Sequence, residues 1–302
     1  MPIATLIAAD ACESGSISDA CDRLAAAGCA LAEIEWIEPG KAADIGFEGD
    51  IRIAQNALAP MEDRFDVVVQ QAAGRRKMLL VSDMDSTMIT VECIDELADY
   101  AGIKPEIAAI TERAMAGELD FAQALKARVA LLSGLDEKVI AQCLEERVRP
   151  MPGAEAFVRT MAGWGAHTVL VSGGFTSFTG PVATMLGFAE VHANVLEIKS
   201  GKLTGGLAGD IVDAATKRAV LEAAVTANGI DMTAALAVGD GANDLPMIAA
   251  AVAGQGLGVG YHPRPQLAAA ANFSIRHNDL TALLFAQGVR RGDWACEMHE
   301  TN

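Results

Sequence analysis

The sequence is poor in positive charge. Its 302 residues include 23 Lys and Arg against 40 Asp and Glu, which gives a formal net charge of −17 at pH 7. A surface this acidic repels nucleic acids and anionic membranes, so we expect neither as a partner. An anionic substrate would have to be bound by a few local cations, because the field of the whole protein disfavours it.

Long apolar runs are also missing. No uninterrupted apolar segment reaches the roughly 20 residues that a membrane span needs, and residues 1–9 contain no basic leader of the kind that secretory signals carry. The six cysteines form no C-x-x-C pair, and the five histidines show no metal-ligand or triad spacing. We therefore expect a cytoplasmic protein with free thiols.

Residues 78–87, M-L-L-V-S-D-M-D-S-T, are the centre of the pattern. Residues 78–81 resemble a strand buried on both faces of a parallel sheet. Asp83 and Asp85 follow at its carboxyl end, where ligands bind in open α/β sheets. Two carboxylates this close repel each other unless they share a cation or a proton, which indicates a bound metal, two different protonation states, or both. The alternative is that the acids only cap the next helix or turn.

Two further strands end in small, polar or acidic residues. Residues 167–171 precede Ser172-Gly173-Gly174, residues 234–238 precede G-D-G-A-N-D at 239–244, and Lys217 lies in a predicted helix between them. The alternation of apolar strands and helices predicts an α/β fold with a doubly wound parallel sheet. Alone, the serine and glycines could be a simple turn and the lysine a solvated side chain, but their joint order predicts one site.

This set of motifs resembles the four motifs of the haloacid dehalogenase-like phosphatases. With Glu92 nine residues after Asp83, and Arg128 downstream, it resembles the phosphoserine phosphatases of that family in particular. The resemblance covers residues 77–288. It implies a Mg²⁺-dependent phosphatase that hydrolyses O-phospho-L-serine to L-serine and phosphate through a phospho-aspartate intermediate, as the last step of serine biosynthesis.

Phosphoryl transfer needs an in-line nucleophile and cations that neutralise the phosphate oxygens. Asp83 is the candidate nucleophile, and Asp85 is the candidate general acid that protonates the leaving alcohol and then activates water. Mg²⁺ favours oxygen ligands. The carboxylates of Asp83 and Asp240 would supply them, and the resemblance adds the backbone carbonyl of Asp85. Asp244 would orient a metal-bound water or Lys217 without binding the metal itself.

Four residues are candidates to bind the phosphate group. Ser172 and the backbone N–H of Gly173 can bind phosphate oxygens, since glycine lets the main chain approach closely. Lys217 would neutralise phosphate charge and pair with Asp83. Asn243, in the last motif, would contact the phosphate or a metal-bound water.

Phosphoserine also carries an ammonium group and a carboxylate, so a selective pocket needs one more anion and one more cation. By resemblance, Glu92 binds the ammonium group and Arg128 binds the carboxylate, a geometry that guanidinium suits. Phe121 and Met115 are candidates to line the pocket, with ordinary packing in the same helices as the alternative.

The length and the 51% content of hydrophobic residues allow two domains or one with an insertion. Residues 1–72 follow the order βαββαβ, which resembles the ACT amino-acid-binding domain; a packing or dimerising domain without a ligand is the alternative. A basic, solvated hinge follows at 74–77. We expect the catalytic core at 77–92 and 151–290, and a helical cap at 93–150 that excludes water. We also expect a homodimer formed through the N-terminal domain.

Local signals predict several boundaries. The first helix should have Ser16 or Ser18 as its N-cap, and residues 31–37 should form a half-buried strand. In the cap, helices are expected over residues 93–100, 105–116 and 121–132.

Two other functions fit parts of the pattern. An enzyme for another small phosphorylated metabolite would keep the acids, but sugar phosphates offer no ammonium group for Glu92 and no carboxylate for Arg128. A regulatory amino-acid-binding protein with an inactive hydrolase core would not need the complete set of acids with Lys217. The sequence therefore favours the phosphoserine phosphatase.

Overall fold

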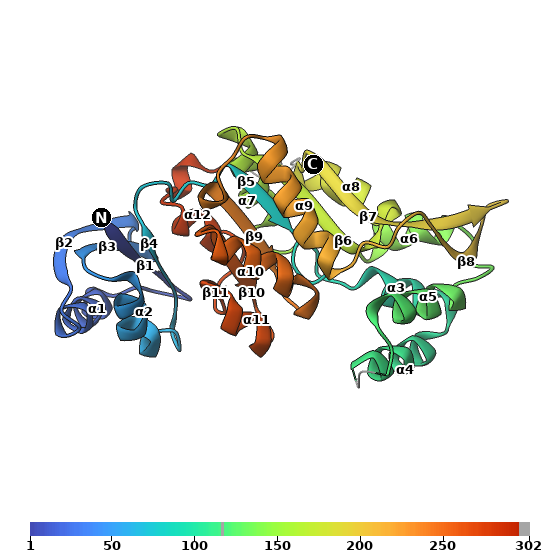
Figure 1. Ribbon diagram of the computed structural model, residues 1–302, viewed down its shortest axis with the longest axis horizontal. Coiled ribbons are helices and arrows are strands. Elements are labelled where there is room, and N and C mark those ends of the chain that lie inside the picture. Colours follow the sequence, from blue (N-terminus) through green and yellow to red (C-terminus); the bar gives the residue numbers. More distant parts are fainter. Residues whose placement is uncertain (116–117, 296–302) are drawn as a thin grey trace.

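Two β-sheets, each with its own helices, make up the computed structural model, which describes residues 1–115 and 118–295 (Figure 1). The smaller sheet is built from the N-terminal part of the chain, and the larger one from the rest. No helix within these described ranges is long and apolar enough to span a membrane.

The N-terminal sheet is antiparallel. Its elements are β1 (Pro2–Ala8), α1 (Ser14–Ala26), β2 (Ala30–Glu38), β3 (Ala42–Glu48), α2 (Ile51–Leu58), the 3₁₀ turn η1 (Ala59–Met61) and β4 (Phe65–Gln71). The strands lie in the order β2-β3-β1-β4. Leu24 of α1 and Leu58 of α2 share a core with Leu6 of β1 and Phe47 of β3. The expected βαββαβ order of a small α/β domain is therefore confirmed.

Two local expectations for this domain are wrong. The first helix begins at Ser14, after the N-cap residue Glu13, so Ser16 and Ser18 lie inside it. Strand β2 is mostly exposed rather than half-buried: Leu31 and Ile34 are 43% and 46% exposed, and only Ile37 is buried. Strand β2 is an outer strand with β3 as its one neighbour, whereas β4, the other outer strand, is covered by contacts with β11 of the larger sheet.

The larger sheet has seven strands. They are β5 (Leu79–Ser82), β6 (His167–Phe175), β7 (Glu190–Lys199), β8 (Lys202–Ala208), β9 (Ala235–Gly239), β10 (Leu257–Tyr261) and β11 (Phe273–Ile275). Their order is β11-β10-β9-β5-β6-β7-β8. All neighbours are parallel except the β7–β8 hairpin. The strand that carries Asp83 at its carboxyl end is thus the central one.

Helices cover both faces of this sheet. They are α7 (Ala154–Gly163), α8 (Thr176–Leu186), α9 (Ala214–Ala227), α10 (Leu245–Ala253), α11 (Pro265–Ala270) and α12 (Ala282–Ala286), with the 3₁₀ turns η2 (Met232–Ala234), η3 (Ala242–Asp244) and η4 (Arg291–Asp293). Leu80 of β5 packs in one core with Phe157 of α7. Leu79 packs in the other, with Leu221 of α9 and Ile248 of α10. Successive residues of β5 thus pack against helices on opposite faces of the sheet, which confirms the doubly wound α/β fold.

Four helices lie between β5 and α7 in the sequence: α3 (Cys93–Ala101), α4 (Lys104–Met115), α5 (Phe121–Leu131) and α6 (Lys138–Glu146). Three match the expected helices, and α6 was not expected. The β7–β8 hairpin reaches out to α5 (Figure 1), and Leu203 of β8 exchanges backbone hydrogen bonds with Gly134 and Leu135, 2.8 and 2.9 Å. The boundaries of the cap, the core and the N-terminal domain stay predictions. The side chain of Met115 lies outside the described residues.

The hinge is solvated only in part: Gly74 and Arg76 are exposed as expected, but Lys77 is not. Lys77 is only 6% exposed, and its Nζ donates to the carbonyl oxygens of Gly74 and Thr233, 3.1 and 2.7 Å. Arg75 pairs with Asp44 of β3. The basic residues of the hinge therefore tie the two sheets together.

Asp66 of β4 is the main polar anchor between the two sheets. It is 1% exposed. Its carboxylate accepts hydrogen bonds from the backbone N–H groups of Arg276, His277 and Asn278, at 2.7, 3.1 and 3.1 Å, and from the side-chain amide of Asn278 at 2.7 Å. The loop after β11 thus depends on a single buried carboxylate for its backbone donors.

We expect Asp66→Ala to lower the free energy of unfolding by about 3 kcal/mol, because it leaves buried donors without an acceptor. Urea unfolding would measure this loss. Asp63→Ala, an exposed neighbour, is the control and should stay within about 0.5 kcal/mol of the unchanged protein. Equal stability of the two variants would contradict the anchoring role of Asp66.

Candidate active site

The candidate site lies at the carboxyl ends of the central strands. Asp83 directly follows β5, and its N–H donates to the carbonyl oxygen of Val238 in β9, 3.0 Å. Asp240 directly follows β9. Because β5 and β9 are parallel neighbours, their ends meet at one edge of the sheet.

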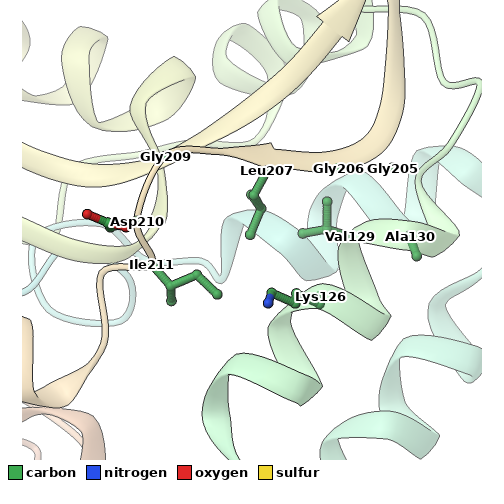
Figure 2. A pocket seen from close by; sticks show the side chains of 9 residues that line it. All are labelled: Lys126, Val129, Ala130, Gly205, Gly206, Leu207, Gly209, Asp210 and Ile211. Carbon is green, nitrogen blue, oxygen red and sulfur yellow. The ribbon is translucent and has the colours of Figure 1, made fainter.

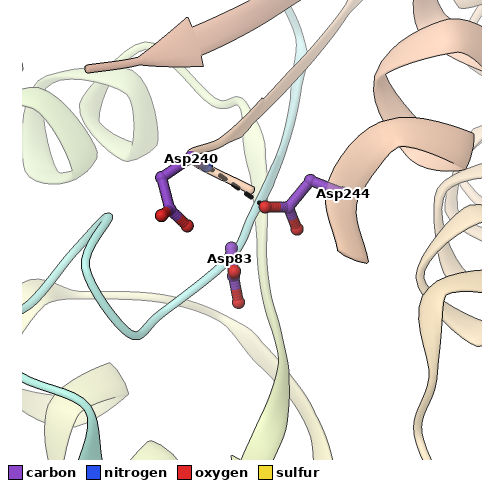
Figure 3. A group of neighbouring side chains, drawn as sticks. All are labelled: Asp83, Asp240 and Asp244. Carbon is purple, nitrogen blue, oxygen red and sulfur yellow. Dashed lines mark hydrogen bonds between the residues drawn. The ribbon is translucent and has the colours of Figure 1, made fainter. Parts of the chain in front are cut away.

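Three carboxylates gather at this edge. Oxygen atoms of Asp83, Asp240 and Asp244 lie within 4.8 Å of one another (Figure 3). Burial, with Asp83 and Glu92 nearby, raises the pKa of Asp240 to about 6. Carboxylates at these distances need a cation between them, and a set of hard oxygen donors suits Mg²⁺. The residues present therefore fit the expected metal ion.

Lys217 is the cation that the protein itself supplies. It lies on α9 and is 1% exposed. Its Nζ is 2.6 Å from Oδ1 of Asp83 and 2.8 Å from Oδ1 of Asp244. Burial alone would lower the pKa of Lys217, but the two carboxylates outweigh it and raise that pKa. The structure thus brings together the lysine and the acids that lie far apart in the sequence.

Both oxygen atoms of Asp244 accept hydrogen bonds. Oδ1 accepts from Lys217, and Oδ2 accepts from the backbone N–H groups of Asp240 and Gly241, both at 3.1 Å. A Cβ atom at Gly239 would lie 2.3 Å from the Asp244 carboxylate, so only glycine fits there. These contacts favour an orienting function for Asp244.

Asp85 belongs to a second group of side chains near Asp83, together with Glu92, Ser86 and Cys93. Burial, followed by Glu92 and Asp83, raises the pKa of Asp85 to about 8, and the N–H of Cys93 points to its Oδ1 at 3.4 Å. Ser86 adopts a φ of 56°, which is uncommon outside glycine, and its Oγ donates to Oε1 of Glu92, 2.8 Å. Sequence reasoning did not find Ser86 or Cys93. Ser86 lies within the D-M-D-S-T motif, and that position could have marked it as a site residue. No feature of the sequence marked Cys93.

Ser172, Gly173 and Gly174 lie inside β6 rather than after it. Ser172 Oγ accepts from the N–H of Gly174, 2.8 Å. A Cβ atom at Gly174 would lie 2.9 Å from Oδ2 of Asp85, and one at Gly173 would lie 3.0 Å from the ring of Phe121. Glycine thus lets the strand approach the acids on one side and α5 on the other.

Asn243 and Arg128 are the last two candidates. Asn243 donates from Nδ2 to Oδ2 of Asp83, 3.2 Å. Arg128 lies on α5, where burial lowers its pKa against the opposing effect of Asp95 and Glu92. Within residues 1–115 and 118–295, its Nε has one long contact, to the carbonyl oxygen of Ala124 at 3.4 Å, so this part of the chain leaves guanidinium donors available.

A groove of about 670 Å³ lies between α5 and β8, on the far side of α5 from Arg128. The residues that line it are Lys126, Val129, Ala130, Gly205, Gly206, Leu207, Gly209, Asp210 and Ile211 (Figure 2). None of the candidate site residues is among them. The groove is therefore separate from the acid cluster.

Comparison with known proteins agrees with this geometry. The sequence profile of the haloacid dehalogenase-like hydrolases matches residues 80–249. A phosphoserine phosphatase of Mycobacterium tuberculosis is 42% identical over 250 residues, which are 82% of this chain but only 60% of that protein. This chain therefore matches less than two thirds of that relative's length.

Solved structures give the same picture. A probable phosphoserine phosphatase from Vibrio cholerae, in its unliganded form, has a TM-score of 0.75 and 32% identity, covering 95% of this chain and 85% of that one. The solved structure of a phospho-aspartyl intermediate analogue of a phosphoserine phosphatase has a TM-score of 0.63 and 35% identity. The match covers 69% of this chain and 98% of that one. The chain therefore belongs to the haloacid dehalogenase-like hydrolases, and within that family to the phosphoserine phosphatases.

Proposed function

We propose that this protein hydrolyses O-phospho-L-serine to L-serine and phosphate, with Mg²⁺ and through a phospho-aspartate at Asp83. The observation that carries the proposal is the contact of Lys217 with both Asp83 and Asp244 beside Asp240. This arrangement holds a nucleophilic carboxylate, a phosphate-neutralising cation and metal ligands together at one sheet edge.

Asp83 and Asp240 would hold the metal ion with carboxylate oxygens, and Asp85 would add its backbone carbonyl. A bound Mg²⁺ withdraws charge from the phosphate oxygens and reduces their repulsion of a carboxylate. Asp244 would act on Lys217 rather than on the metal ion, because its Oδ1 accepts from Lys217 and its Oδ2 from two backbone N–H groups. It keeps Lys217 charged and aimed at the phosphate.

In the first step, a carboxylate oxygen of Asp83 attacks phosphorus. The bond from phosphorus to the serine oxygen breaks, and Asp85 donates its proton to that oxygen. In the second step, water attacks phosphorus, the bond from phosphorus to Asp83 breaks, and Asp85 takes the proton of the water. The buried position of Asp85 beside other acids favours its protonated form before the first step.

The amino-acid part of the substrate would lie between Glu92 and Arg128. Glu92 is held by Ser86 and would accept the ammonium group. Arg128 would bind the carboxylate with its two-pronged guanidinium. Ser172, Gly173, Lys217 and Asn243 would bind the phosphate oxygens.

Phosphate release from a substrate panel tests the proposed function. We expect L-phosphoserine to be the preferred ester among small phosphorylated metabolites, sugar phosphates included, because only it has partners for Glu92 and Arg128. Removal of Mg²⁺ with a chelator should abolish release, and added Mg²⁺ should restore it. Preference for a sugar phosphate would contradict the substrate assignment.

We expect Asp83→Asn to reduce turnover by at least about 10³-fold, because an amide is a poor nucleophile and a poor metal ligand. Steady-state phosphate release measures the loss. Asp19→Asn, on the surface of α1, is the matched control and should retain activity. Near-normal turnover in Asp83→Asn would mean that another group attacks phosphorus.

Arg128→Ala should raise KM for phosphoserine by on the order of tenfold to a hundredfold, the value of a charged hydrogen bond. KM for phosphoethanolamine, which has no carboxylate, should change by less than about twofold. Arg113→Ala, an exposed arginine of α4, is the control. Equal effects on both substrates would remove Arg128 from the carboxylate site.

The proposal includes a place in serine biosynthesis, a cytoplasmic location and a homodimer. The five cysteines among the residues that the structure describes are buried and free, which fits a reducing compartment. The outer strand β2, with Leu31 and Ile34 exposed, is the edge of the N-terminal sheet through which a second copy would bind. Sedimentation of the purified protein would give its mass in solution.

A further inference from the structure

The pairing of β6 with β7 is interrupted at the phosphate-binding residues. The two strands are in parallel register at Val171 and His192, and they resume at Phe175 and Asn194. Strand β6 thus advances by four residues where β7 advances by two. The interruption leaves the backbone groups of the Ser172–Gly174 segment without regular partners in the ladder.

The side chain of Asn194 supplies one of the missing bonds. Asn194 is 1% exposed, and its Nδ2 donates to the carbonyl oxygen of Gly173, 2.8 Å. Its Oδ1 accepts from the N–H of Val212, also 2.8 Å, and its Nδ2 has a longer contact of 3.5 Å with the carbonyl oxygen of Val212. One amide therefore joins two segments of backbone.

The second segment leads directly to Lys217. Val212 precedes Asp213, the N-cap residue of α9, whose Oδ1 accepts from the N–H of Thr216, 2.8 Å. The N–H of Lys217 donates to the carbonyl oxygen of Asp213, 3.0 Å. The position of the first turn of α9 thus depends on Val212, and the lysine projects from that turn to Asp83.

We propose that Asn194 is a positioning residue for phosphate binding: it clamps the Gly173 segment to the start of α9, so that the serine, the glycine N–H and Lys217 face one phosphate group together. The identity of the ligand as a phosphate group rests on the proposed function. The contacts of Asn194 do not, because they are seen in the structure. Asn194 does not itself reach the reacting atoms; it acts through Gly173 and Val212.

The clamp needs both halves of an amide. Asparagine donates to Gly173 and accepts from Val212 with one side chain, whereas aspartate of the same shape can only accept. Asn194→Asp would place a carboxylate oxygen against the carbonyl oxygen of Gly173, and this repulsion would push the segment away. Asn194→Ala would remove both bonds without adding a charge.

Asn272 offers a matched control. It makes the same kind of clamp, since its Oδ1 accepts from the N–H of Gly258, 2.9 Å, and its Nδ2 donates to the carbonyl oxygen of Gly256, 3.0 Å. It directly precedes β11, and its side chain binds the backbone at the amino end of β10, at the opposite edge of the sheet from the acids. Asn272→Asp therefore makes the same chemical change away from the site.

The experiment measures binding of inorganic phosphate to the full-length protein with Mg²⁺ present, by titration calorimetry. We expect Asn194→Asp and Asn194→Ala to raise the Kd for phosphate by about tenfold or more, the loss that follows from two misplaced charged or polar contacts. Asn272→Asp should stay within about twofold of the unchanged protein. Reversible unfolding raises the apparent Kd by the reciprocal of the folded fraction, so a tenfold rise would need a folded fraction of about one tenth. Circular dichroism at the titration temperature, showing each variant mostly folded, therefore separates misplaced contacts from lost stability.

A kinetic measurement separates positioning from general loosening. The ratio of kcat/KM for phosphoserine to that for phosphoethanolamine should stay the same in both Asn194 variants, because Arg128 lies on α5, outside the clamp. The inference would be overturned if the Kd for phosphate stayed unchanged in the Asn194 variants. It would also be overturned if Asn272→Asp raised that Kd as much as the Asn194 variants do. If the unchanged protein binds phosphate but does not hydrolyse phosphoserine, the proposed substrate is wrong, and the phosphate titrations still decide the function of Asn194.

Discussion

The buried ion pair of Lys217 with Asp83 and Asp244 is the constraint on which the rest of the site depends. A lysine ammonium group that is 1% exposed loses several kcal/mol of hydration, and only well-placed carboxylates offset such a loss. Asp83 follows β5, Asp244 follows β9, and Lys217 lies on α9. The three elements must therefore pack in one arrangement, and the two cores on either face of the sheet hold them there.

The site remains too negative to bind an anion without help. The candidate site has two cations, Lys217 and Arg128, against five acids: Asp83, Asp85, Asp240, Asp244 and Glu92. Burial and the neighbouring acids raise the pKa of Asp85 to about 8 and that of Asp240 to about 6. The whole chain adds a net charge of −17. A divalent cation at the acids is the simplest way to make an incoming phosphate group favourable.

Irregular backbone concentrates where the site needs polar groups. The ladder between β6 and β7 is interrupted at Ser172 to Gly174, and Ser86 adopts a left-handed conformation next to Asp85. Regular strands would use these backbone groups for pairing and would leave none for a ligand. Side chains such as Asn194 and Ser86 then support the irregular segments, so that they stay ordered on the edge of a rigid sheet.

The sequence by itself determined the features that depend on neighbouring residues. Apolar runs, helical spacing and the acids after β5 and β9 were enough to predict the doubly wound sheet and to select Asp83 and Asp240. Lys217 was selected only by the joint order of the motifs and their resemblance to a known family. Only the tertiary structure decided that Asp244 binds Lys217 and two backbone N–H groups, that β2 is exposed, that Lys77 is buried, and that Asn194 and Asp66 join distant segments. The physical reason is that such contacts form between residues far apart along the chain, for which local periodicity carries no signal.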